Sequence, residues 1–175
     1  MKGYFAIGCE GISKPMNVGA LMRTAHAFGA SFCFTVAPNT DEVDFGWSDT
    51  SSAAGTVPLY SYPDVASFAL PKGAALVGIE LMAESVELPS FRHPRQAVYV
   101  LGSERGGLSP EMTARCDHVV QIPTRFSLNL SLAGALVLYD RLISLGRFAP
   151  RPLMPGGPTE PLPPHVHGAP KFIGG

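Results

Sequence analysis

Two short apolar runs restrict the fold of this 175-residue chain more than any other feature. Residues 74–80 and 96–102 are apolar without the alternation of a strand that has one face in water. Continuous runs of this kind are typical of parallel strands that are covered on both faces. Because parallel strands need crossover connections, helices are expected between them.

The rest of the chain fits this alternation. Further strands are predicted at residues 4–8, 31–37, 57–60 and 118–122, and helices at 17–28, at 63–70 and from 109 onward. Asn17 is the expected N-cap of the first helix and Gly29 its stop. The pattern predicts one α/β domain over residues 1–148, a parallel sheet with helices on both faces. Residues 149–175 are rich in proline and glycine and are predicted to be a tail.

The last helix is expected from about residue 129 to 145, with Gly146 as its stop. Its apolar side chains cover nearly the whole circumference of the helix, so burial of one face does not account for them. Pairing with a second copy of the chain would bury the second face, and packing within one protomer is the alternative. We therefore expect a homodimer formed through this helix.

Composition excludes several classes of protein. The three cysteines are far apart and form no C-x-x-C pair, so neither a disulfide framework nor a zinc ribbon is indicated. We expect a cytoplasmic protein with no signal peptide or membrane span. His165 and His167 have no third ligand nearby, so no metal site is predicted. A net charge of −1 excludes a globally positive surface and leaves a local basic patch open.

Three blocks of glycine, small polar and charged residues stand where a strand gives way to a turn. They lie at residues 17–29, 101–109 and 122–131. Parallel α/β proteins build their sites at such turns. The second block is no dinucleotide fingerprint, because Ile122-Pro123 stands where a ribose-binding acid would follow. The chain has no G-x-S-x-G, H-E-x-x-H or Walker motif either.

Taken in order, the blocks read N-x-G-x-x-x-R-x-x-x-x-F-G, L-G-S-E-x-x-G-L-S and I-P-x-x-x-S-L-N-x-S-x-A. This order resembles motifs 1, 2 and 3 of the SpoU/TrmH-type RNA ribose 2′-O-methyltransferases of the SPOUT superfamily, over roughly residues 4 to 147. The resemblance implies a parallel α/β sheet with a C-terminal trefoil knot, a rare exception to the rule against threaded loops. It also implies a homodimer that binds S-adenosylmethionine in the knot.

The resemblance further implies which residues form the site. By matching positions, the cofactor contacts are Ile79, Gly102, Ile122 and Leu128, and the catalytic residues are Asn17, Arg23, Glu104, Ser127 and Asn129. A guanidinium stays protonated, so Arg23 is interpreted as a charge that lowers the pKa of the ribose hydroxyl and stabilises the alkoxide. Glu104 and Asn17 would hold the arginine and the loops, and Ser127 and Asn129 would position phosphate, ribose or cofactor.

Several alternatives stay open. The expected partner is RNA, more readily tRNA than rRNA for so compact a chain, and neither DNA nor a membrane. Arg125-Phe126 replaces a methionine-glycine stretch common in the family, and the family's appended N-terminal RNA-binding domain is not expected here. A related enzyme that methylates a base, or an RNA-binding module without catalysis, would share part of the pattern. Asn17 and Asn129 could serve only as helix caps, and Glu104 only as a surface ion-pair partner.

Overall fold

The computed structural model describes residues 4–39, 56–103, 106–148, 151–152 and 155–156. Its strands are β1 (Phe5–Glu10), β2 (Phe32–Val36), β3 (Leu59–Tyr62), β4 (Ala75–Ile79), β5 (Val86–Glu87), β6 (Ala97–Leu101) and β7 (His118–Gln121). Its helices are α1 (Pro15–Phe28), the single 3₁₀ turn η3 (Leu88–Ser90), α2 (Pro110–Arg115) and α3 (Leu130–Leu145).

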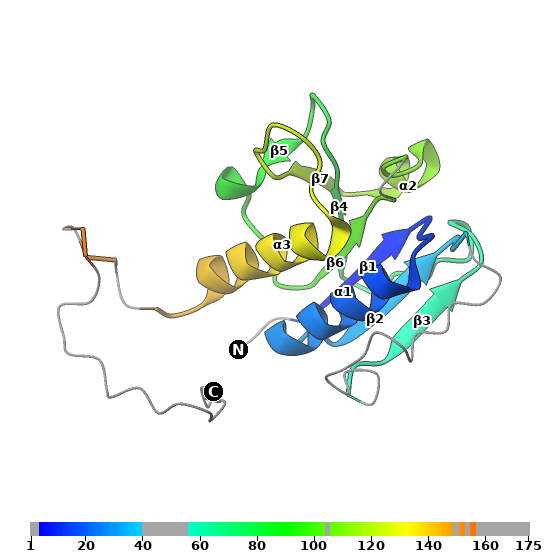
Figure 1. Cartoon of the computed structure of the whole chain (residues 1–175), viewed down its shortest axis with the longest axis horizontal. Helices are drawn as coiled ribbons and strands as arrows, with labels where there is room; N and C mark the ends of the chain where they lie inside the picture. The colour runs from blue at the N-terminus through cyan, green and yellow to red at the C-terminus, as the bar shows by residue number, and fades with distance from the viewer. Residues whose placement is uncertain (1–3, 40–55, 104–105, 149–150, 153–154, 157–175) are drawn as a thin grey trace.

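The strands form one parallel sheet of seven strands in the order β3-β2-β1-β6-β4-β7-β5 (Figure 1). β6 lies between β1 and β4, with Tyr99 level with Ile7 on one side and with Val77 on the other. Parallel pairing brings the carboxyl ends of β1, β6, β4 and β7 to one edge of the sheet. The turns that follow these strands therefore lie together.

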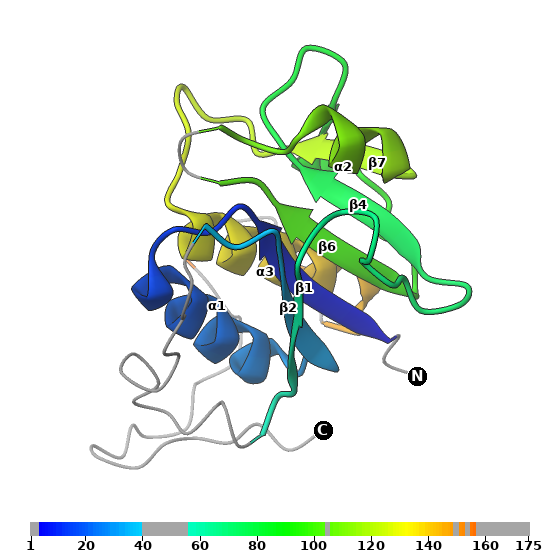
Figure 2. The same cartoon turned by 90° about the vertical axis from the view of Figure 1, so that its right-hand side faces the viewer.

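Helices cover both faces of the sheet, as the sequence predicted (Figure 2). Alternate residues of β6 divide between two apolar cores, because successive side chains of a strand point to opposite faces. Tyr99 and Leu101 belong to the core under α1 and α3, whereas Val98 and Val100 belong to the core that includes Met112 of α2. α1 and α3 lie side by side on the same face.

The first helix begins three residues earlier than the sequence analysis expected, when the two N-cap positions are compared. Lys14 is its N-cap and Pro15 occupies the first turn, where the fixed φ of proline suits a helix and its missing N–H costs nothing. The prediction of Asn17 as the cap is therefore wrong, and Asn17 lies buried within the first turn. Gly29 ends the helix as predicted, with a left-handed φ of 74°.

The helix predicted at residues 63–70 is not formed. Asp64 and Ser67 hydrogen-bond each other instead: the Ser67 amide donates to Asp64 Oδ1 at 2.7 Å and the Ser67 hydroxyl to the Asp64 carbonyl at 3.0 Å. Such local bonds compete with helix formation. Phe68 still packs on the sheet, with its ring stacked 4.9 Å from that of Phe34. The sequence analysis also missed β5, because two exposed residues carry no periodic signal.

A buried polar network lies beneath the C-terminal half of α3. His93 Nδ1 lies 2.6 Å from the Tyr99 hydroxyl and Nε2 lies 2.9 Å from Asp140 Oδ2. Arg141 donates to the carbonyls of Pro94 at 2.6 Å and Arg95 at 2.8 Å. A neutral imidazole with its proton on Nε2 satisfies both partners of His93. The network fastens the segment before β6 to α3.

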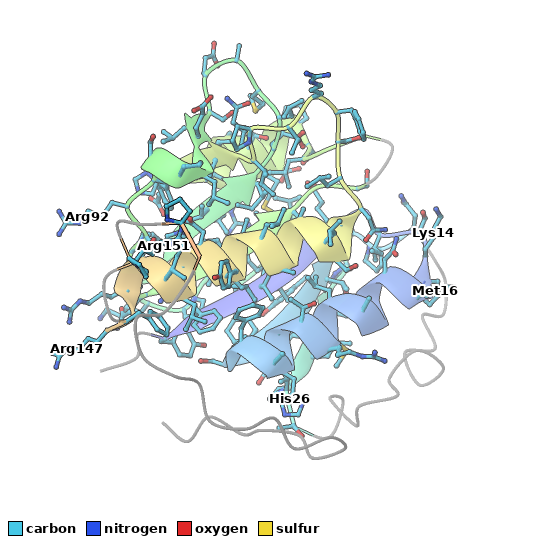
Figure 3. The ribbon with its side chains drawn as sticks, turned by 60° about the vertical axis from the view of Figure 1, so that its left-hand side comes forward. Lys14, Met16, His26, Arg92, Arg147 and Arg151 are labelled. Carbon is cyan, nitrogen blue, oxygen red and sulfur yellow. The ribbon has the colours of Figure 1, made fainter. Side chains whose placement is uncertain are left out.

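α3 is buried on one side only. Val137, Leu138 and Arg141 face the sheet and α1, whereas Leu132, Leu136 and Tyr139 are 54%, 40% and 51% exposed. Figure 3 looks onto this outer face, with Lys14 and Met16 at one end and Arg92 and Arg147 at the other. Packing within the described part of one protomer thus leaves the second apolar side of α3 uncovered.

No helix in the described part of the chain is long and apolar enough to cross a membrane.

Candidate active site

A pocket of about 380 Å³ opens at the carboxyl edge of the sheet, above β4, β6 and β7. All of the residues predicted to contact the cofactor line it: Ile79, Gly102, Ile122 and Leu128. They come from the ends of three strands and from the segment before α3. In open parallel sheets, ligands bind outside the carboxyl ends of the strands. The structure therefore gathers these residues in a place that suits a ligand, although it does not test the contacts themselves.

The pocket has an apolar base and a polar rim. Ile79, Leu101 and Leu130 lie at the base, and Ser127 and Asn129, which were predicted to be catalytic, also line the pocket. Among the described lining residues, Glu80 is the only one that carries a charge. The arrangement suits a ligand with an apolar body and a positive charge, as negative potential in a cleft favours cations.

One wall of the pocket is formed by Gly102, Ser103 and Gly107, in the turn that leads from β6 to α2. A Cβ atom on Gly102 would run into the backbone of Gly107 and Leu108, which return directly over it. Ser103 and Gly107 exchange two backbone hydrogen bonds of 3.1 and 3.0 Å. Glycine is thus required at 102 because the turn folds back on itself.

Two carboxylates missed by the sequence analysis hold this turn. Glu80 Oε2 accepts from the Leu108 amide at 2.7 Å, and Glu10 Oε2 accepts from the Ser109 amide at 2.9 Å. β6 lies between β1 and β4, so the two glutamates approach the turn from opposite sides. The only signal for them in the sequence is that Glu10 and Glu80 each stand at the end of an apolar strand.

Two predicted catalytic residues meet where α1 and α3 begin. Asn129 Nδ2 donates to Asn17 Oδ1 over 3.4 Å, joining residues that are 112 positions apart. Asn129 is also the N-cap of α3, and its Oδ1 accepts from the Ser131 amide at 3.0 Å. Capping and a place at the pocket rim are therefore compatible for Asn129.

Arg23 does not line this pocket in the described part of the chain. It lies exposed on α1 and borders a second hollow, which α1 and α3 form with Met16, Ala20, Thr24, Ser131, Leu132 and Ala135. The hollow belongs to the uncovered outer face of the two helices. Like Asn17, Arg23 is therefore not among the described residues that line the pocket. Glu104, His165 and His167 lie outside the described residues.

Comparison with known proteins identifies relatives of the chain. The family model described as SpoU rRNA Methylase family matches residues 4–139. The tRNA (guanosine(18)-2'-O)-methyltransferase TARBP1 of Mus musculus is 30% identical over 138 residues, which are 74% of this chain and 9% of that protein. The 23S rRNA (guanosine-2'-O-)-methyltransferase RlmB of Coxiella burnetii is 30% identical over 152 residues, 82% of this chain and 59% of the relative. This chain therefore spans less than two thirds of either relative.

Solved structures share the fold. The AdoMet-bound rRNA methyltransferase from Sinorhizobium meliloti superposes with a TM-score of 0.74 at 24% identity, covering 84% of this chain and 59% of that one. The TrmH/SpoU tRNA modifying enzyme from A. aeolicus gives 0.69 at 22% identity, covering 82% of this chain and 76% of that one. These neighbours confirm the SPOUT-type sheet. The trefoil knot stays a prediction from the sequence resemblance.

Proposed function

Because this chain belongs to the SpoU rRNA methylase family, we propose that it methylates a ribose 2′-hydroxyl of RNA with S-adenosylmethionine as methyl donor. The observation that carries the proposal is the pocket in which Ile79, Gly102, Ile122 and Leu128 come together beside Ser127 and Asn129. The Sinorhizobium meliloti relative with this fold was solved with AdoMet bound.

The residues at the pocket fit S-adenosylmethionine. Ile79, Ile122 and Leu128 would contact its adenosine, and Glu80 carries a charge opposite to that of its sulfonium. When bound, the cofactor supplies an electrophilic methyl group whose sulfur departs without an acid. What the chain must provide is activation of the ribose oxygen.

Arg23 is proposed to provide it. A guanidinium cannot accept a proton at neutral pH, but its charge lowers the pKa of a nearby hydroxyl and stabilises the alkoxide that forms. Asn17, which accepts a hydrogen bond from Asn129, would hold the arginine and the loops, and Asn129 would position the ribose at the rim. Ser127 would position phosphate or cofactor, and Glu104 would orient the arginine. The proton would pass to a phosphate oxygen or to water.

The position of Arg23 favours an active site shared by two copies. Arg23 lies outside the pocket of its own chain, on a face where Leu132 and Leu136 are left exposed. A homodimer through α3 would cover those side chains and could bring the partner's Arg23 to the pocket of this chain. This arrangement accounts for both the separated arginine and the apolar outer face of α3.

Of the two RNA classes, we propose tRNA as the substrate. The mouse relative with 30% identity is named as a tRNA 2′-O-methyltransferase, which supports this choice. The Coxiella burnetii relative is named as an enzyme of 23S rRNA, so rRNA is the alternative substrate.

The test is methyl transfer from labelled S-adenosylmethionine to unmodified tRNA and, in parallel, to unmodified rRNA. Digestion to nucleosides followed by mass spectrometry should give a 2′-O-methylnucleoside from tRNA. A methylated base would support the related base-modifying enzymes instead. No transfer to either RNA by a preparation that binds the cofactor would contradict the proposed activity.

A further inference from the structure

Glu80 has an unusual position for a glutamate. It follows directly after β4, lines the pocket, and is the only charged side chain among the described lining residues. Both of its carboxylate oxygens accept backbone amides: Oε1 from Leu81 at 2.9 Å and Oε2 from Leu108 at 2.7 Å. The carboxylate is thus held in one orientation from two sides. A fixed side chain of this kind pays little entropy when a ligand arrives.

The turn that Glu80 holds is itself held from the far side. Glu10 is 6% exposed and its Oε2 accepts from the Ser109 amide, next to the amide that Glu80 binds. Ser109 in turn caps α2, with its hydroxyl oxygen accepting from Met112 at 3.0 Å. Successive amides of the turn are therefore bound to carboxylates from both flanking strands. Structural support of the turn explains why acceptors are needed, and a carboxylate supplies the two acceptor oxygens that the Leu81 and Leu108 amides require.

The charge of Glu80 also bears on the ligand. Among the described residues no ion pair is found for Glu80. An anion in a partly enclosed pocket raises the affinity for a cation and lowers it for anions. S-adenosylmethionine carries a sulfonium, whereas the product S-adenosylhomocysteine has a neutral thioether in its place.

We propose that Glu80 is a specificity-determining residue that favours the cationic cofactor over its neutral demethylated product. The inference rests on the proposed function for the identity of the ligand, and on the amide contacts and the charge of the pocket for the role of the residue. Glu80 lowers the free energy of the complex with S-adenosylmethionine and does nothing comparable for S-adenosylhomocysteine. S-adenosylmethionine therefore displaces the product more readily than the shared adenosine and amino-acid parts alone would allow.

The test compares the affinities of both ligands for the full chain by calorimetry. Glu80→Gln keeps the shape and an amide-accepting oxygen but removes the charge, and we expect the preference for S-adenosylmethionine over S-adenosylhomocysteine to fall about 5- to 10-fold. Glu80→Asp keeps the charge but shortens the reach to Leu108. It should weaken both ligands together and retain most of the preference. Glu84→Gln, an exposed glutamate of the same segment, is the matched control and should leave both affinities unchanged.

Amide exchange at Leu108 and Ser109 reports whether the turn remains folded in each variant. An unchanged ligand preference in a Glu80→Gln protein whose turn is intact would overturn the inference. An equal loss for both ligands would overturn it too, because Glu80 would then only support the turn. If the wild-type chain binds neither ligand, the proposed function fails, and that result is distinct from either outcome for the variant.

Discussion

The pocket at the carboxyl edge of the sheet and the outer face of α1 and α3 differ in how far a single chain completes them. The walls of the pocket are fixed by hydrogen bonds within one chain. Glu10 and Glu80 hold its turn, and Asn129 donates to Asn17 at its rim. The outer face has an arginine, a hollow and exposed leucines. A pocket fixed by its own chain can bind a ligand, whereas an uncovered apolar face gains stability only when another surface covers it.

This difference separates cofactor binding from the action of the motif arginine, although the sequence motifs contain residues for both. The motif residues at the pocket suit cofactor binding, and the motif arginine stands on the face that a second copy would cover. Damage to one region should therefore leave the task of the other intact. The four predictions below start from this comparison and run from the largest expected effect to the smallest.

Arg23→Ala should lower methyl transfer on the order of 100- to 1,000-fold and leave the affinity for S-adenosylmethionine nearly unchanged. In the proposed mechanism the charge acts on the alkoxide in the transition state, and Arg23 is not among the described residues that line the pocket of its own chain. Single-turnover kinetics and calorimetry measure the two quantities. Thr24 borders the same hollow, and Thr24→Ala, which removes no charge, serves as the control. Near wild-type turnover by Arg23→Ala would exclude this mechanism, and Glu104 would be the next candidate.

Mixing variants shows whether Arg23 acts across the dimer. Gly102→Val should abolish binding of S-adenosylmethionine, because the added side chain would collide with the backbone of Gly107. If the partner's Arg23 completes each pocket, an equal mixture of Arg23→Ala and Gly102→Val chains should regain about a quarter of the wild-type activity. Each mixed dimer then has one intact site. A mixture that exchanges subunits and stays inactive would place Arg23 and the pocket in the same protomer.

Leu136→Asp should convert the proposed dimer into monomer at micromolar concentration. Leu136 is 40% exposed on the outer face of α3 in the single chain, and burying an unpaired carboxylate between two copies costs several kcal/mol. Sedimentation measures the change, and the cofactor should still bind the monomer because the pocket is closed within one chain. Ser144→Asp adds the same charge at an exposed polar position of α3 and is the control. A monomeric wild type would refute the dimer.

The smallest effect is expected at the inner side of α3. Burial lowers the pKa of His93, although Asp140 opposes the change, so the folded chain binds a proton there less readily than the unfolded chain. Stability should therefore fall as pH drops through the ordinary histidine pKa of about 6.5. His93→Gln should make the free energy of unfolding, measured in urea, less dependent on pH in this range. His26→Gln, on α1, is the control, and an equal pH dependence in wild type and His93→Gln would contradict the prediction.

The strands and long helices could be predicted because their signals are local. Residues 74–80 and 96–102 are continuous apolar runs, and they became β4 and β6 at the centre of the sheet. Gly29 and Asn129 were predicted as the end of α1 and the start of α3. The helix at residues 63–70 failed because the pairing of Asp64 with Ser67 outweighs a weak periodic pattern.

The candidate site was predictable only in part. The strand ends that hold Ile79, Gly102 and Ile122 could be expected to meet, since parallel strands present their carboxyl ends at one edge. The side of α1 on which Arg23 stands, and the bonds from Glu10 and Glu80 to the turn, depend on how helices and loops pack. Residues 10 and 109 are 99 positions apart, and no local pattern links them.

By itself the sequence determined the parallel α/β class, the order of the motifs and the family to which they belong, because local periodicity and turn chemistry are written along the chain. Tertiary structure alone decided that the turn at Gly102 is held by two carboxylates and that Arg23 lies outside the pocket. It also left the outer face of α3 uncovered. The physical reason is that hydrogen bonds and apolar contacts between distant residues depend on their positions in space, which the spacing along a chain does not specify.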